Sequence, residues 1–237
     1  MKRLLLPLTF TVLSAVALAL PSAASARIVE LGTPSDEASL NCPGTAEDRC
    51  VAAVRMTGLP GRVSGGRKNP YYIRRDGHLV AFTVQLAKPT EEESNFFENS
   101  WGSPSTARVS VLRKGDTRKT RLNYRLIRQS DTFRLDRYFG SRPTFVFDSP
   151  IPVKKGNWIG LTVPTWAPLL ATNLDRSNWW RASRPSDSCE GEEFGVRQFA
   201  MEDLREVNKF GCTYHGARLL YTVTYVPGNR VTNPAGD

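Results

Sequence analysis

The sequence predicts an all-β protein built as an antiparallel β-sandwich. From Leu79 onward, the chain consists of short segments in which apolar and polar residues alternate with a period of two, separated by turn residues. Such alternation is typical of strands with one buried and one solvated face, and the segments are too short for helices. The chain contains no internal repeat and no low-complexity segment, which excludes solenoids and propellers.

The first 26 residues are organised as a secretory signal peptide. Lys2 and Arg3 precede an apolar run from Leu4 to Leu20, and Ala24-Ser25-Ala26 offers small residues for cleavage. No later apolar stretch is long enough to span a bilayer, and the tail at residues 229–237 carries no hydrophobic anchor. We therefore expect a secreted, extracellular protein, with a cell-envelope location left open, and no membrane span after cleavage.

The remaining 211 residues are enough for one large sandwich, and their cysteines predict disulfides. The four cysteines Cys42, Cys50, Cys189 and Cys212 permit three pairings. Pairing of Cys42 with Cys50 and of Cys189 with Cys212 is favoured, because each pair brackets a loop-like segment rich in Gly, Asp and Glu. A zinc site is disfavoured because no Cys-x-x-Cys spacing occurs, and no metal or other cofactor is predicted.

Three segments follow the predicted cleavage site. Residues 27–72 contain too few apolar residues for a core of their own, so we expect a disulfide-tied lead-in there. The sandwich domain is predicted at residues 73–228 and a flexible tail at residues 229–237. Strands are expected around Val80–Leu86, Val109–Val111, Leu122–Leu126, Phe145–Phe147, Ile151–Val153, Ile159–Val163 and Leu219–Tyr225.

One short helix is predicted in the connection between Pro89 and Ser103. Thr90 and Glu93 have the spacing of a capping box, and the acidic first turn suits the helix dipole. Phe97 and Trp101 lie four residues apart, on one helical face that can pack on a sheet edge.

The segment FVFDSPIPVKKGNWIGLTVP, residues 145–164, carries a resemblance to known proteins. A strand with Phe145 and Phe147 on one face is joined to an apolar strand by the reversal Lys155-Gly156-Asn157. Together with the strands VAFTV and ARVSVL, this segment resembles the jelly-roll-like β-sandwich modules of uncharacterised secreted bacterial proteins, over roughly residues 79–165. The resemblance implies a jelly-roll-like fold and export. It supplies no catalytic residues to carry over.

Tryptophans and their polar neighbours are the candidate ligand-binding residues: Trp158, Trp166, Trp179, Trp180, Asn178 and Arg181. Trp158 lies on the strand face opposite Ile159, toward solvent or a covering loop. Trp179 and Trp180 are neighbours and must point to opposite faces of a strand, so at least one ring is expected outside the main core. An exposed tryptophan suits the apolar face of a sugar ring. The alternative is that the rings form small cores under loops.

The surplus of basic residues in the chain favours a polyanionic partner. Without Lys2 and Arg3, 30 basic side chains face 23 acidic ones, which favours anionic wall polymers, polysaccharides or other polyanions. The basic residues are scattered along the chain, so no specific nucleic-acid partner is predicted. A basic stripe on one sheet face is expected from the alternating positions Arg108, Arg113, Arg121, Arg125 and Arg128.

Catalytic chemistry has few candidates. His78 and His215 are the two histidines, and no nucleophile elbow, zinc-binding His-Glu-x-x-His or phosphate loop occurs. Carboxylates could serve a glycosidase, and the candidates are Asp136, Asp148, Asp175, Asp187, Glu190, Glu192 and Glu193.

Three functions are therefore open. The first is a secreted, non-catalytic surface or envelope module that binds a glycan through aromatic loops. The second is a carboxylate-dependent, glycan-active enzyme on the same scaffold. The third is a structural or adhesion protein whose basic sheet face binds protein or an anionic wall polymer. The sequence does not indicate the oligomeric state.

Overall fold

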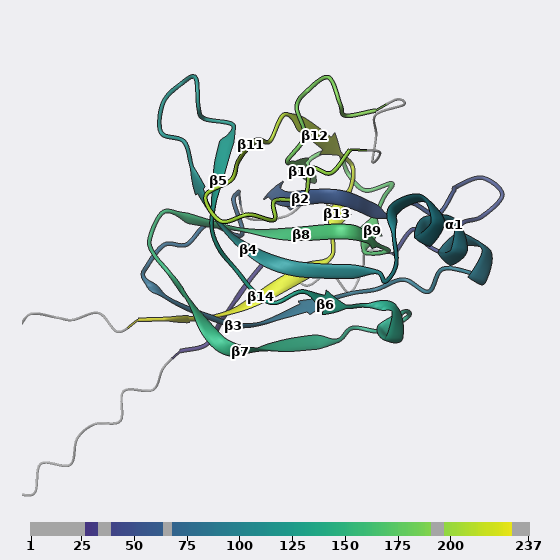
Figure 1. Cartoon of the computed structure of the whole chain (residues 1–237), viewed down its shortest axis with the longest axis horizontal. Coiled ribbons are helices and arrows are strands. Elements are labelled where there is room, and N and C mark those ends of the chain that lie inside the picture. The colour runs from purple at the N-terminus through teal and green to yellow at the C-terminus, as the bar shows by residue number, and fades with distance from the viewer. Residues whose placement is uncertain (1–26, 33–38, 64–67, 191–196, 229–237) are drawn as a thin grey trace, which may run out of the picture.

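The computed structural model describes residues 27–32, 39–63, 68–190 and 197–228, and it confirms the all-β sandwich (Figure 1). The predicted signal peptide and tail lie outside the described residues. The smaller sheet has the order β1 (Val29–Leu31), β14 (Tyr221–Pro227), β3 (Gly77–Val84) and β7 (Thr144–Val153). All of its strand pairs are antiparallel.

The larger sheet packs against the smaller one. Its order is β11 (Val207–Lys209), β5 (Asn123–Gln129), β4 (Thr106–Lys114), β8 (Asn157–Ala167), β2 (Ala53–Arg62), β10 (Trp179–Ala182) and β12 (Cys212–His215), with β6 (Phe133–Arg134) pairing with β4. A separate short pair joins β9 (Leu170–Ala171) to β13 (Arg218–Leu219), and a 3-10 helix η1 spans Asp136–Tyr138. The main core between the sheets includes Phe82 and Val223 of the smaller sheet and Val109 and Leu161 of the larger one.

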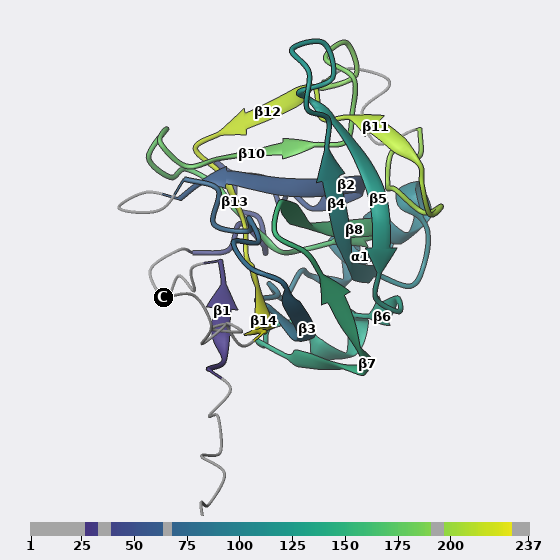
Figure 2. The ribbon, with the colours of Figure 1, turned by 90° about the vertical axis from the view of Figure 1, so that its left-hand side faces the viewer.

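The larger sheet is also rolled toward a barrel. Its two edge strands, β11 and β12, are separated in the chain by only Phe210 and Gly211, so the edges must approach each other. In both ribbon views these edges lie on the side of the molecule away from the smaller sheet (Figures 1 and 2). The concave face encloses a second core, formed by Leu59, Leu112, Tyr124, Leu126, Trp158, Met201 and Phe210.

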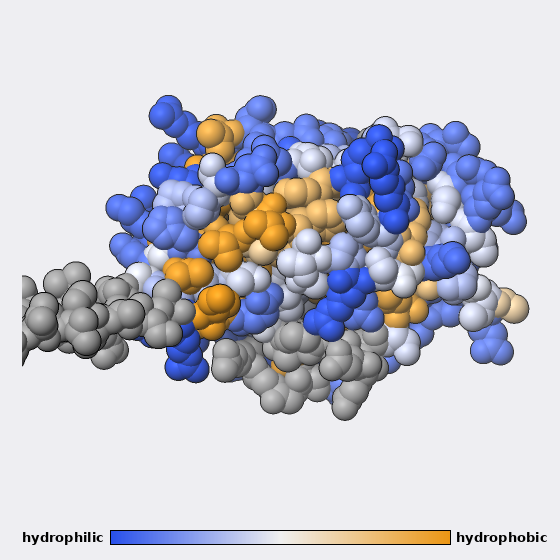
Figure 3. All heavy atoms as spheres, turned by 90° about the horizontal axis from the view of Figure 1, so that it is seen from below, coloured by the Kyte–Doolittle hydropathy of each residue, from blue (hydrophilic) through white to orange (hydrophobic). Residues whose placement is uncertain are grey.

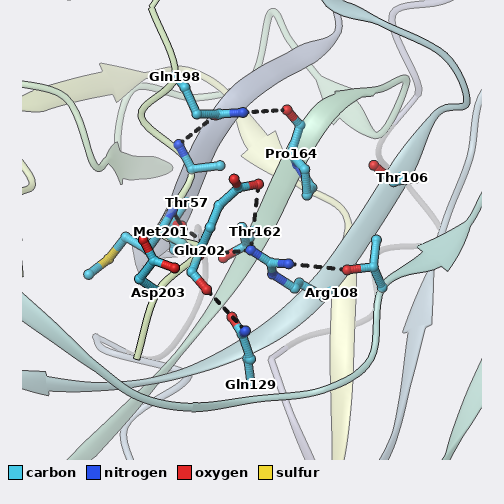
Figure 4. Close-up of polar contacts among 12 residues, drawn as sticks. Thr57, Thr106, Arg108, Gln129, Thr162, Pro164, Gln198, Met201, Glu202 and Asp203 are labelled. Carbon is cyan, nitrogen blue, oxygen red and sulfur yellow. Dashed lines mark hydrogen bonds and ion pairs between the residues drawn. The ribbon is translucent and has the colours of Figure 1, made fainter. Parts of the chain in front are cut away.

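Residues 197–206, called the strap below, cross this concave face from β2 to β5 (Figure 4). The Met201 amide donates to Thr57 Oγ1 at 3.0 Å, and Gln129 Nε2 donates to the Glu202 carbonyl at 3.1 Å. Beneath the strap, the Thr162 hydroxyl is hydrogen-bonded to those of Thr57 (2.8 Å) and Ser110 (2.6 Å). A row of buried hydroxyls thus links β2, β8 and β4 and fixes the strap to the sheet.

The prediction of a lead-in at residues 27–72 is wrong for the part that forms β2. Ten residues of that segment form a strand between β8 and β10, near the middle of the larger sheet, and so belong to the sandwich. β2 is buried along almost its whole length because it has a core on either side. The expected boundary at residue 73 therefore does not separate the lead-in from the sandwich.

The helix and the disulfides agree with the sequence-based expectations. α1 (Glu91–Trp101) begins with the capping box of Thr90 and Glu93. Its Phe97 ring stacks on Trp166 at 4.9 Å, and Trp101 packs beside them. The disulfides are Cys42–Cys50 and Cys189–Cys212, the two local pairings. Two disulfides are compatible with an extracellular location.

Candidate functional site

A basic groove runs along β5. Its cationic lining residues are Arg113, Lys114, Arg125, Arg128 and Arg205, and Asp116 is the one carboxylate among the described lining residues. The groove has a volume of about 820 Å³. Leu204 and Val207, which are 59% and 46% exposed, add apolar surface to it. The groove therefore offers a chain-like ligand several positive charges and some apolar contact.

The strand register explains how these arginines gather. Arg113 pairs with Arg125 and Val111 pairs with Arg128, and residues directly opposite in an antiparallel pair share one sheet face. This is the face on which Val109 and Val111 enter the main core. Near the β4–β5 turn, the same face carries arginine and lines the groove.

The basic stripe expected from the sequence is therefore divided. Arg108 lies on the opposite face, where it donates to the Met201 carbonyl at 3.1 Å and pairs with Glu202 at 3.7 Å, under the strap (Figure 4). Its burial lowers the pKa of its guanidinium, partly offset by nearby Glu202. Arg121 is not among the residues that line the groove. Of the predicted stripe, Arg113, Arg125 and Arg128 line the groove together.

A second cavity, called the mouth pocket below, opens at the end of the barrel-like roll. Its lining includes Lys114, Tyr124, Trp158, Trp179 and Arg181, and its volume is about 120 Å³. Lys114 lies over the Trp158 ring, with Nζ 5.6 Å from the centroid, and Arg181 Cζ lies 5.2 Å from the Trp179 centroid. Each ring thus holds a cation by a cation–π contact. Lys114 also lines the basic groove, so the two cavities adjoin.

The backbone and the surrounding charge shape the mouth pocket. A Cβ atom on Gly61 would lie 1.9 Å from the Trp179 ring, so only glycine lets this ring lie against β2. Burial raises the pKa of Tyr124 to about 12, and the nearby Arg181 opposes that rise. Tyr124 and Arg181 come from β5 and β10, which are separated by three strands in the sheet. Their proximity is a consequence of the roll.

The structure brings Trp158, Trp179 and Arg181 together in the mouth pocket, whereas Trp158 and Trp166 lie in small cores, which is the alternative that the sequence left open. Trp158 is 9% exposed because the second core covers most of its ring. Trp166 is fully buried under α1, and Trp180 is buried and stacked on Tyr214 at 4.6 Å. Asn178 is buried and donates to the Asp175 carbonyl. Trp179 alone of these rings remains partly exposed.

Lys114 and Tyr124 were missed as candidates. Their signal in the sequence was weak, because a lysine after a strand and a tyrosine in an alternating strand are both common. Only the roll of the sheet places them beside the two tryptophans.

The candidate carboxylates are scattered. Asp136 pairs with Arg134 at 3.2 Å. Hydrogen bonds from the side chain and then from the backbone amide of Ser177 lower the pKa of Asp175. Asp148 lies in a cavity of about 370 Å³ with Asp131, and this cavity shares Arg128 and Leu204 with the basic groove. Glu192 and Glu193 lie outside the described residues. Among the described residues, no group of three or more His, Cys, Asp or Glu could hold a metal ion.

The face formed by the smaller sheet differs in character. Seen from below, it carries a band of apolar side chains (Figure 3). On this sheet Val146 is 70% exposed, and Thr83 and Thr144 are hydrogen-bonded across β3 and β7. Across the described ranges, the protein has no helix both long and apolar enough for a membrane span. By contrast, the mouth pocket combines two cations with two aromatic rings and adjoins the basic groove.

Comparisons of the chain with protein-family models, with curated proteins and with solved structures find no match. Function must therefore be inferred from the charges and rings of the basic groove and the mouth pocket.

Proposed function

We propose that this protein is an exported, non-catalytic module of the cell surface or envelope that binds an anionic polymer in the basic groove. The observation that carries this proposal is the groove lining, in which five cationic side chains accompany a single carboxylate. Like charges gathered in one groove repel one another, and an anionic ligand relieves that repulsion while it gains several ion pairs.

The shape of the groove favours an extended ligand. It is open to solvent along β5 and continues at Arg128 and Leu204 into the cavity beside β7. A polymer with regularly spaced charges can contact several arginines at once, so that individually weak surface ion pairs add up. Arginine suits this role because its planar guanidinium binds carboxylate or phosphate through two parallel hydrogen bonds.

The test is the binding of the purified protein to polygalacturonate, polyphosphate and neutral dextran at several salt concentrations. We expect both anionic polymers to bind and dextran not to bind, with affinity that falls steeply as the Debye length shrinks from about 10 Å at 0.1 M salt to about 3 Å at 1 M. The double variant Arg125→Gln/Arg128→Gln should bind both polymers about tenfold more weakly.

The matched control is Arg118→Gln/Arg121→Gln. It removes the same charge from exposed positions near the β4–β5 turn that do not line the groove. If the control variant loses as much affinity as the groove variant, binding depends on net charge alone and the groove is not the site. Absence of binding to both anionic polymers would refute the proposal.

A glycan-active enzyme is the second candidate, and the shared cavity of Asp131 and Asp148 favours it over other catalytic schemes. A glycosidase requires two carboxylates that flank the bond to be cleaved. Under this alternative the protein should release reducing ends from polygalacturonate, and Asp148→Asn should abolish the release while binding persists. Binding with no released ends, at high protein concentration and over a day, would exclude this activity on that polymer.

A further inference from the structure

We infer that the mouth pocket recognises a carboxylate-bearing sugar unit, so that the anionic polymer bound in the groove is a polyuronate. This inference rests on the proposed function, because the pocket would act on one unit of the chain that occupies the groove.

The two cation–π pairs give the pocket its chemical preference. Lys114 over Trp158 and Arg181 over Trp179 place two positive charges beside two aromatic rings in one cavity. Arg181 Nε donates to Thr213 Oγ1 at 3.2 Å, which orients the guanidinium and leaves its two terminal nitrogens to donate to a carboxylate. A ligand that fits must combine an apolar face with an anionic substituent.

A uronic acid has both features. The C–H groups on one face of a pyranose ring can lie against the exposed part of Trp179, and the carboxylate on the ring can reach Arg181 and Lys114. A phosphate chain has the charge but no apolar face, and a neutral hexose has the face but no charge. The pocket volume of about 120 Å³ is well below the roughly 300 Å³ of common small-molecule sites, which limits the pocket to part of one sugar unit.

Continuity with the groove connects the two sites. Lys114 lines both cavities, and its strand partner Tyr124 lines the mouth pocket on the neighbouring strand. A sugar held in the pocket therefore has adjoining units at the start of the groove, where the arginines contact the following carboxylates. The groove supplies charge-dependent affinity, and the pocket supplies the discrimination between anionic polymers.

The experiment compares three ligands and two kinds of variant. Affinity for polygalacturonate, for its fully methyl-esterified form and for polyphosphate is measured for the wild type, for Trp179→Ala, for Arg181→Gln and for the control Arg118→Gln. We expect Trp179→Ala and Arg181→Gln each to weaken polygalacturonate binding about tenfold and polyphosphate binding less than about twofold. The control should change the two affinities equally and slightly, and the methyl ester should bind poorly to every form.

The outcomes separate this inference from the proposed function. If the pocket variants lower the affinity for both anionic polymers equally, or lower neither affinity, the pocket does not recognise a uronate, although the groove proposal stands. The inference also fails if the wild type binds polyphosphate with the same affinity as polygalacturonate, because the pocket is expected to add affinity for polygalacturonate alone. If it binds neither polymer, the proposed function itself fails. Arg181→Gln changes a partly exposed side chain, so it remains informative if Trp179→Ala proves unstable, which thermal unfolding of each variant will show.

Discussion

The buried hydroxyl row beneath the strap yields a prediction for Thr162→Val. The Thr162 side chain is fully buried and is hydrogen-bonded to Thr57 at 2.8 Å and to Ser110 at 2.6 Å. Valine has nearly the same shape as threonine, so the substitution removes the hydroxyl while leaving the packing in place. The change in the free energy of unfolding therefore reports on the hydrogen bonds rather than on a cavity.

The magnitude follows from the partners. Two hydrogen bonds are lost, each with a net contribution of about 1 kcal/mol. Ser110 also remains fully buried after losing its Thr162 partner, which costs a further 1–3 kcal/mol or so, whereas Thr57 keeps its bond from the Met201 amide. Burial of the new methyl group offsets about 0.8 kcal/mol. We expect a net loss of about 2–4 kcal/mol, which corresponds to a fall in Tm of about 4–16 °C for a domain of this size.

Urea unfolding followed by tryptophan emission gives the change in free energy, and calorimetry gives the change in Tm. The matched control is Thr83→Val, which makes the same substitution at the hydroxyl pair of Thr83 and Thr144, 2.8 Å apart on the surface. Water replaces the lost partner there, so the control should lose less than about 0.5 kcal/mol. If both variants lose the same free energy, the buried hydroxyl row contributes no more to stability than a surface hydroxyl pair and the reasoning is wrong.

Three further predictions concern the disulfide, the mouth pocket and its tyrosine. Replacement of Cys189 and Cys212 by serine should lower the free energy of unfolding by about 3 kcal/mol, because the bond closes a loop with a sequence separation of 23 residues; denaturant unfolding would measure it. Gly61→Ala should displace the Trp179 ring and weaken polygalacturonate binding without changing polyphosphate binding, since its Cβ would meet that ring at 1.9 Å. The phenolate absorbance of the wild type should include one transition near pH 12 that Tyr124→Phe lacks. Because the pKa of Tyr124 is higher in the folded protein than its ordinary value of about 10, its contribution to stability is present below pH 10 and is lost as the pH rises toward 12.

The features that the sequence predicted well depend on local interactions. The capping box of Thr90 and Glu93 spans one helical turn, and the Cys42–Cys50 disulfide has a sequence separation of 8 residues. Period-two alternation identified β3, β4 and β8 for a similar reason, since each has one face toward the main core. None of these predictions required knowledge of which strands are neighbours.

β2 shows why the lead-in was misinterpreted. A strand with a core on both sides lacks the polar alternation that marks a half-buried strand. Gly58 and Gly61 are typical turn residues, but each serves close packing in β2, because a Cβ atom would meet Leu219 at 2.2 Å or the Trp179 ring at 1.9 Å, respectively. In the sequence alone, a glycine that allows another side chain to approach closely looks the same as a glycine in a turn. The two cases differ only when the approaching residue is known.

The tryptophans show a second limit of the same kind. Alternation placed Trp158 on the face opposite Ile159, which is correct, but it could not show that Met201 of the strap and Phe210, which follows β11, cover that face. The covering residues Met201 and Phe210 lie more than 40 residues away in the chain, and only the roll of the larger sheet brings them there. Sequence alternation indicates the strand face on which a side chain lies. Whether that side chain is exposed depends on which other segment of the chain packs on the same face.

Because the larger sheet extends past the smaller one, the two faces of the β4–β5 strand pair carry different surfaces. Along β4, Val109, Val111 and Arg113 lie on one face, so the change from valine to arginine marks the point at which this face leaves the main core. The other face carries Leu112 in the second core and then Lys114 at the mouth pocket. A rolled sheet that extends past its partner therefore creates the cationic groove on one face and the mouth pocket on the other, using adjacent residues of two strands. Because neighbouring side chains point to opposite faces, a substitution at Arg125 should weaken the charge-dependent affinity for both anionic polymers, whereas a substitution at Tyr124 should affect the discrimination between them, even though the two residues are consecutive.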